Sequence, residues 1–210
     1  MIKKEKLLVL APHTDDESFG CGGLIVKTIN EGGEVVILLF AKNYGNKNYN
    51  EFYKAIKILG VSRKNVIHTQ YDDRPLEFDQ IGIKSIIDII YSACNSVKPT
   101  TVAIPFIDSF HQDHEIVGKA SIAALRPHGY IPDRVLEYEQ PFYGVWGFKS
   151  FQPNYYVNLS SDQIKKKVEA LKCYKSQTVP TDMVISMAIT RGIEIGTRLA
   201  EAYILRREIR

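Results

Sequence analysis

The feature that most constrains this chain is an apolar run that leads directly into a dense group of titratable side chains. Residues 7–10, Leu-Leu-Val-Leu, are uninterrupted by any polar residue, which is typical of a strand buried on both faces. Pro12 ends this run, and four titratable residues follow it: His13, Asp15, Asp16 and Glu17. Open α/β sheets bind their ligands where such strands end. We therefore expect a functional site here rather than an ordinary acidic turn.

The next part of the chain repeats the pattern of a buried strand followed by an amphipathic helix. Apolar runs predict further strands at 35–40, 66–69, 101–105 and 135–139. Apolar residues at helical spacing predict helices at 22–30, 52–59, 83–91 and 116–125. Apolar and acidic residues alternate in the strand at 135–139, so we expect it to be half exposed. The alternation predicts a Rossmann-like α/β fold with a mostly parallel sheet and helices on both faces, in a single domain over residues 1–210.

The C-terminal third is less regular. A short strand is predicted at 155–157, and Ser160 or Ser161 is expected to cap a helix that runs to Lys175. The polar face of this helix carries four lysines, which we expect to be solvated: Lys165, Lys166, Lys167 and Lys172. A last amphipathic helix is predicted at 184–204.

Composition excludes several classes of protein. The chain of 210 residues is long enough for one sizeable core, and 45% of its residues are hydrophobic. The net charge of +3 is small and spread along the chain, which argues against a nucleic-acid partner. No apolar run is long enough for a signal peptide or a membrane span, and three distant cysteines do not form a disulfide framework. We expect a cytoplasmic protein in a reducing compartment.

A second polar cluster follows the strand at 101–105 and contains His111, Asp113 and His114. Loops that follow neighbouring parallel strands lie at one edge of a sheet, so the two clusters can meet. Either one alone could be ordinary surface, but together, in a chain with five histidines, they favour a metal site at the C-terminal edge of the strands. Imidazole and carboxylate ligands without thiolate suit zinc or a similar divalent ion.

These motifs resemble those of a known enzyme family. The segment Pro12-His13-Thr14-Asp15-Asp16-Glu17, followed by Gly20-Cys21-Gly22-Gly23, resembles the signature of the LmbE-like (PIG-L) zinc N-deacetylases. His111-Gln112-Asp113-His114 is similar to their second motif, and weaker similarity extends to residues 191–202. Thr14 stands where the family commonly has Pro. The resemblance implies an enzyme that removes the acetyl group from an N-acetylglucosamine-type sugar.

The resemblance also implies a role for each residue of the two clusters. It implies three ligands for one Zn²⁺, or another divalent metal, per chain: His13, Asp16 and His114. Asp15 would be the general base that activates the metal-bound water. A protonated His111 would stabilise the oxyanion, with Asp113 holding one of its ring nitrogens. Apart from the resemblance, Glu17 is a candidate to orient the ligand residues through hydrogen bonds.

Loops at the same edge of the sheet contain residues that could bind a sugar. Asp73 and Arg74 can bind sugar hydroxyls, and the aromatic run at 142–151 offers flat apolar faces. The expected substrate is a small amino sugar, free or linked to a nucleotide or another aglycone. A homo-oligomer is compatible with the sequence.

Two alternatives to the sugar deacetylase stay open: a non-catalytic sugar- or partner-binding protein on the same fold, and a metal-dependent amidohydrolase that acts on a non-sugar amide. A dinucleotide-binding domain is disfavoured because the chain lacks Gly-x-Gly-x-x-Gly after the first strand. A serine hydrolase is disfavoured because no Gly-x-Ser-x-Gly elbow is present.

Overall fold

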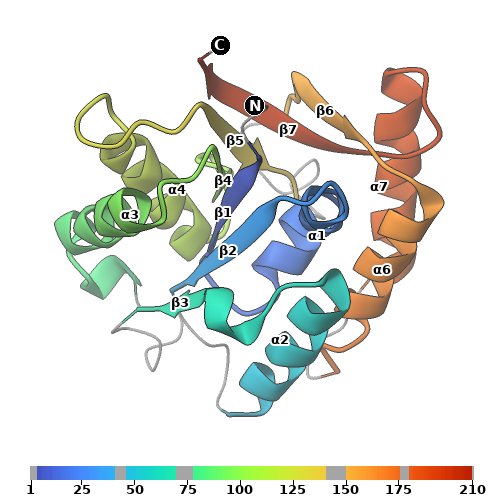
Figure 1. Ribbon diagram of the computed structural model, residues 1–210, viewed down its shortest axis with the longest axis horizontal. Helices are drawn as coiled ribbons and strands as arrows, with labels where there is room; N and C mark the ends of the chain where they lie inside the picture. The colour runs from blue at the N-terminus through green and yellow to red at the C-terminus, as the bar shows by residue number, and fades with distance from the viewer. Residues whose placement is uncertain (1–3, 41–45, 70–77, 141–149, 176–179, 210) are drawn as a thin grey trace.

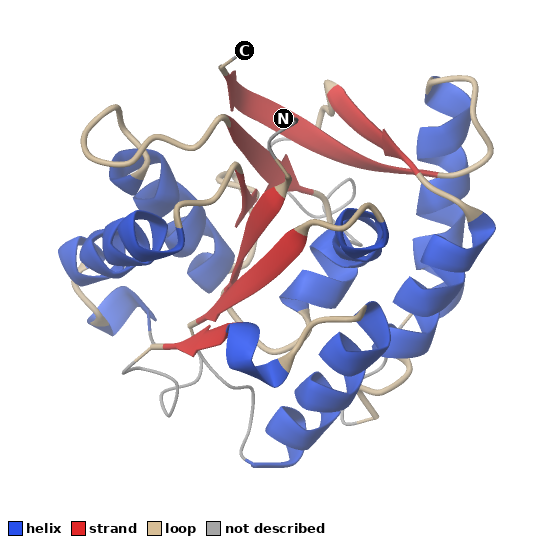
Figure 2. Cartoon of the chain, viewed as in Figure 1, coloured by secondary structure: helices blue, strands red, loops and turns tan. Residues whose placement is uncertain are grey.

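In the computed structural model, a seven-stranded sheet runs through the centre of the molecule (Figures 1 and 2). The structure describes residues 4–40, 46–69, 78–140, 150–175 and 180–209. In chain order the strands are β1 (Lys6–Ala11), β2 (Glu34–Leu39), β3 (Val66–His68), β4 (Thr101–Pro105), β5 (Arg134–Tyr138), β6 (Tyr155–Asn158) and β7 (Ala200–Glu208). Their order across the sheet is β3-β2-β1-β4-β5-β7-β6. The first five strands are parallel, whereas β7 is antiparallel to both β5 and β6.

Helices cover both faces of this sheet (Figure 1). One face is covered by α3 (Ile83–Val97) and α4 (Gln112–Ala124). The other is covered by α1 (Asp16–Asn30), α2 (Asn46–Leu59), α6 (Ser161–Leu171) and α7 (Thr181–Glu194). Short 3-10 turns occupy Arg63–Asn65 and Phe78–Gln80. The predicted α/β fold with a mostly parallel sheet is confirmed.

The alternation of side chains along β1 explains why the strand is apolar throughout. Leu7 and Val9 pack into the core under α1 and α2, whereas Leu8 and Leu10 pack into the core under α3 and α4. A strand with helices on both sides has no solvent face, so every position must be apolar. In the part of the chain that the structure describes, no helix combines the length and the apolar character that crossing a membrane would require.

The C-terminal region differs from two of the sequence-based predictions. The helix expected to run to Lys175 ends at Leu171 as α6. The single helix predicted at 184–204 is wrong, because α7 ends at Glu194 and the chain then forms β7. Gly196, at φ 71°, lies in the turn between them. The residues of β7 alternate between the two faces of the sheet, but their apolar members also fit a helical spacing, so periodicity alone did not separate the two. The strand at 155–157 is confirmed as β6.

Two expectations about exposure are also wrong, for the same reason. Glu137 in β5 was expected on a half-exposed strand, but it is fully buried and forms an ion pair with Arg206 of β7. Lys167 was expected on a solvated helix face, but it is buried and pairs with Glu201 of β7 at 2.7 Å. In both cases β7 brings the partner that makes a buried charge tolerable.

Candidate metal centre

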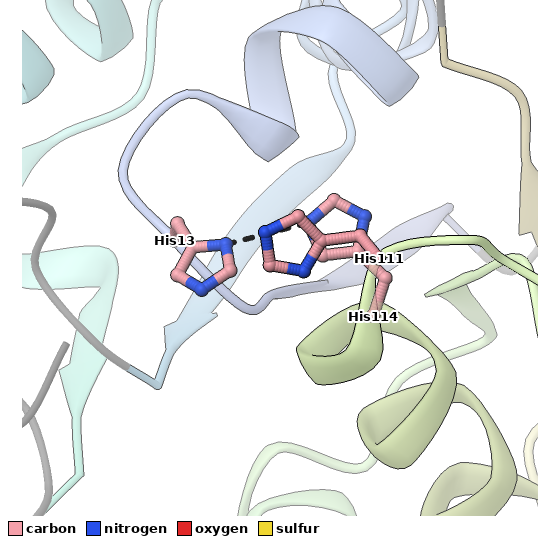
Figure 3. A group of neighbouring side chains, drawn as sticks. All are labelled: His13, His111 and His114. Atoms are coloured by element: carbon pink, nitrogen blue, oxygen red, sulfur yellow. Dashed lines mark hydrogen bonds between the residues drawn. The ribbon is translucent and has the colours of Figure 1, made fainter. Parts of the chain in front are cut away.

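The two polar clusters meet because β1 and β4 are adjacent, parallel strands. The first cluster lies between β1 and α1, and the second lies between β4 and α4. Both helices begin earlier than the sequence indicated, so that Asp16 opens α1, and Asp113 and His114 lie in the first turn of α4. Figure 3 shows His13 from the first cluster facing His111 and His114 from the second. The predicted meeting of the clusters at the C-terminal edge of the strands is therefore found.

Donor atoms of His13, Asp16 and His114 lie 3.2–3.5 Å apart, with a different Asp16 oxygen near each histidine. His114 Nε2 lies 3.3 Å from His13 Nδ1 and 3.2 Å from Asp16 Oδ1. His13 Nδ1 lies 3.5 Å from Asp16 Oδ2. Zinc–ligand bonds of about 2.0–2.1 Å in tetrahedral geometry would separate the ligand atoms by about 3.3 Å. All three residues are buried, and their nitrogen and oxygen donors suit zinc or a similar metal.

Asp113 contacts the ring nitrogen of His13 that points away from Asp16 and His114. His13 Nε2 donates a hydrogen bond to Asp113 Oδ2 at 2.8 Å, which leaves Nδ1 directed at Asp16 and His114. Metal-binding histidines commonly donate their other N–H to a carboxylate in this way. The prediction that Asp113 holds a ring nitrogen of His111 is wrong. The two residues are only two positions apart at the start of α4, where such neighbours do not face each other.

His111 is the most exposed histidine of the group, and its ring stacks on that of His114 with centroids 4.5 Å apart. Its Nδ1 atom is buried and has no hydrogen-bond partner among the described residues. Ligand atoms of His13, His111 and His114 all lie within 4.8 Å of one another, so His111 is a further candidate ligand, which the resemblance did not indicate. Burial, and then the nearby charges of His114 and His13, lower the pKa of His111 to about 4. These surroundings oppose protonation of His111, and the protonated His111 that stabilises the oxyanion stays a prediction.

The cluster holds an ionised carboxylate between imidazoles. Burial opposes ionisation of Asp16, but the charges of His114 and His13 and their hydrogen bonds outweigh it and keep the pKa of Asp16 well below its usual value. Burial likewise opposes charging of His13, but hydrogen bonds with Asp113 and Asp16 raise the pKa of His13 to about 9. The raised pKa of His13 and the lowered pKa of Asp16 show that this cluster favours positive charge beside an ionised carboxylate.

Other contacts fix the first cluster from distant parts of the chain. Gln140, which follows β5, donates from Nε2 to Asp16 Oδ1 at 2.5 Å. Tyr174, which follows α6, donates to Glu17 Oε1 at 2.6 Å. The predicted base, Asp15, is buried immediately before α1. No sequence signal linked Gln140 or Tyr174 to the site, because they lie 124 and 157 positions from their partners. Tyr174 lies in a segment of weaker family similarity, residues 172–177, which did not indicate its contact.

The proposed sugar-binding residues are not placed by the structure. Asp73 and Arg74 lie outside the described residues, as does the aromatic run except for its last two positions. Phe151, the end of that run, is buried and packs edge-on against Phe106 with centroids 5.2 Å apart. This one aromatic therefore belongs to the core.

The chain is similar to known proteins both in sequence and in fold. The family model PIG-L, described as GlcNAc-PI de-N-acetylase, matches residues 8–125. A diacetylchitobiose deacetylase from Thermococcus kodakarensis is 26% identical over 227 residues, covering 94% of this chain and 81% of that protein. The fold is similar to that of the conserved protein TT1542 from Thermus thermophilus, with a TM-score of 0.79, 22% identity and coverage of 97% and 96% of the two chains. It is also similar to GalB, a 4-carboxy-2-hydroxymuconate hydratase from Pseudomonas putida, with a TM-score of 0.77, 18% identity and coverage of 98% of both chains.

Proposed function

Since this chain belongs to the PIG-L (LmbE-like) family, whose model matches residues 8–125, we propose that it is a metal-dependent hydrolase that removes the acetyl group from an N-acetylglucosamine-type sugar. The observation that carries the proposal is the buried cluster of His13, Asp16 and His114. In it the two imidazole nitrogens lie 3.3 Å apart, and each faces one Asp16 oxygen, at 3.2 and 3.5 Å. The position of Asp113 behind His13 supports the same assignment.

The proposed metal ligands are His13 Nδ1, a carboxylate oxygen of Asp16, and His114 Nε2. A divalent ion such as Zn²⁺ polarises a carbonyl group and makes water nucleophilic at neutral pH when it is bound in a site of this kind. Asp113 keeps the His13 ring in the orientation that presents Nδ1, and Gln140 does the same for the Asp16 carboxylate.

Asp15 is the proposed general base because the family resemblance implies it and because it is a buried carboxylate that directly precedes the ligand Asp16. It takes a proton from the attacking water and returns it to the departing nitrogen, so that the products are acetate and the free amine. His111 is proposed to donate a hydrogen bond to the carbonyl oxygen, where negative charge develops. Its buried Nδ1 atom, which lacks a partner among the described residues, supports this role.

We also propose that residues 1–210 work as one deacetylase domain. The family model ends at residue 125, but the contacts that hold Asp16 and Glu17 come from Gln140 and Tyr174. A boundary after residue 125 would separate the proposed ligands from the residues that orient them.

The sugar part of the proposal rests on the names of the family model and of the Thermococcus kodakarensis relative. Both names refer to N-acetylglucosamine units joined to a further group, so a conjugated amino sugar is the proposed substrate class. The likeness to a hydratase shows that this fold also carries other chemistry. The experiment must therefore test the reaction as well as the sugar.

Purified protein loaded with Zn²⁺ should release acetate from N,N'-diacetylchitobiose or another N-acetylglucosamine conjugate. The matched control is Asp15→Asn, which preserves the shape of the side chain and should bind the same amount of metal without releasing acetate at a comparable rate. An N-acetylated amino acid tests the non-sugar amidohydrolase. Failure of the metal-loaded protein to release acetate from any sugar in the panel would overturn the proposed function.

A further inference from the structure

Asp15 has an unusual backbone conformation. Its φ of 139° and ψ of −25° lie in a region that L-residues rarely adopt, and among the described non-glycine residues only Lys98 shares a positive φ. Such a conformation costs free energy and persists only where surrounding contacts enforce it. On its C-terminal side, the carbonyl oxygen of Asp15 accepts hydrogen bonds from the N–H groups of Ser18 and Phe19, both at 2.9 Å, which ties it to the first turn of α1.

On the N-terminal side, the enforcing contact is the side chain of Glu17. Its Oε2 atom accepts the N–H of Asp15 at 3.1 Å. Its Oε1 atom accepts two hydroxyls, from Ser18 at 2.5 Å and from Tyr174 at 2.6 Å. Glu17 is fully buried and Tyr174 is 2% exposed, so water does not take the place of either partner. Tyr174 is the partner that comes from outside this segment, and it therefore fixes the carboxylate relative to the rest of the fold.

We propose that Glu17 and Tyr174 act as a positioning pair that aims the carboxylate of Asp15. The backbone angles of a residue set the direction of its Cα–Cβ bond, so an acceptor that holds the Asp15 N–H also holds the direction of the side chain. This inference deepens the proposed function, because it rests on Asp15 as the base. Neither Glu17 nor Tyr174 contacts substrate in this account, and both act through Asp15.

The chain contains a matched pair that separates positioning from stability. Tyr203 donates to Glu201 Oε2 at 2.7 Å, and the two oxygens of Glu201 accept the N–H groups of Gly23 and Leu24, both at 2.7 Å. This is again a buried tyrosine that holds a buried glutamate against backbone amides of α1. The amides that Glu201 holds, however, lie about two helical turns from Asp15. Tyr203→Phe removes the same kind of hydrogen bond as Tyr174→Phe.

The experiment compares Tyr174→Phe with Tyr203→Phe in the full-length, metal-loaded protein. Tyr174→Phe should lower kcat by about 10- to 100-fold, as loss of a supporting hydrogen bond typically does, with KM and metal content unchanged. Tyr203→Phe should keep kcat within about twofold. Thermal unfolding midpoints should fall in both variants, because each loses a short hydrogen bond from a buried tyrosine to a glutamate. Tyr203→Phe should fall at least as far, since its hydroxyl also lies 3.4 Å from the Gly20 carbonyl oxygen.

A second measurement does not depend on activity. A hydrogen bond to a carboxylate shifts an amide proton downfield, so NMR of the labelled protein reports each pair directly. Tyr174→Phe should move the Asp15 amide upfield and leave Gly23 and Leu24 in place, and Tyr203→Phe should do the reverse. Equal kcat in the two variants, or an unmoved Asp15 amide in Tyr174→Phe, overturns the inference. Absence of acetate release by the wild type contradicts the proposed function instead, and the amide shifts then decide the positioning pair alone.

Discussion

Replacing Asp113 by alanine tests the assignment of the metal ligands most directly. The carboxylate accepts a 2.8 Å hydrogen bond from His13 Nε2, and the two residues are 2% and 3% exposed. Water therefore cannot replace the lost acceptor, and the His13 ring is free to turn or to change tautomer. Loss of a carboxylate behind a metal-binding histidine typically weakens metal affinity by about 10- to 100-fold, which is about 1.4–2.7 kcal/mol of binding free energy.

The assay is a competition for Zn²⁺ between the metal-free protein and a chelator of known affinity. The control is Glu115→Ala, which removes the same charge from the same first turn of α4. Glu115 is half-buried, and its partner is the exposed side chain of Lys119 at 2.5 Å. We expect Asp113→Ala to bind Zn²⁺ at least tenfold more weakly than Glu115→Ala. Equal affinities of the two variants for Zn²⁺ would refute the reasoning. A loss of turnover without a loss of affinity would indicate that Asp113 acts on His111 rather than on His13.

Three further predictions concern the site and its scaffold. Asp15→Asn should keep its metal and lose about 10²- to 10⁴-fold in turnover, whereas Asp16→Asn should lose the metal itself; equal metal loss in the two, measured by elemental analysis, would mean that base and ligand are exchanged. Chelation should abolish acetate release yet leave the far-ultraviolet circular dichroism almost unchanged, since the hydrophobic core lies apart from the ligands; loss of the spectrum would show that the metal holds the fold. Gly192→Ala should lower the free energy of unfolding by about 1–3 kcal/mol, because its Cβ would lie 2.6 Å from the backbone of Leu199. Gly82→Ala, where a Cβ meets no atom within 4 Å, should be nearly neutral in the same denaturation measurement.

The parallel half of the fold could be predicted because its strands are buried on both faces. The run at 7–10 is apolar at every position and the run at 101–105 at every position after Thr101, and this pattern has few alternatives at such lengths. The same regularity located the site, since strand ends on one edge bring His13 and His114 together whatever the details of the loops. For these elements, local sequence and tertiary environment agree.

The rest could not be predicted because it depends on pairs formed by the full fold. Glu137 and Lys167 looked like solvent-facing residues, and only β7 supplies the charges that bury them. The partner of Asp113 was misjudged for a different reason: the start of α4 at Gln112 decides which way its carboxylate points, and helix boundaries are poorly defined by sequence. Tyr174 and Gln140 act over more than a hundred residues, beyond the reach of any local motif.

The place of β7 in the sheet has a consequence for how the protein is made. β7 lies between β5 and β6, but it is translated after both of them and after all the proposed ligands. A nascent chain that has already emerged from the ribosome with both histidine motifs still has an unpaired edge at β5, and Glu201, which holds α1, is missing. Exposed strand edges are prone to wrong pairing. We therefore expect chaperone binding to be strongest when synthesis is stalled just before residue 200. A metal added at that stage would encounter its ligands before β7 has formed the contacts that order them.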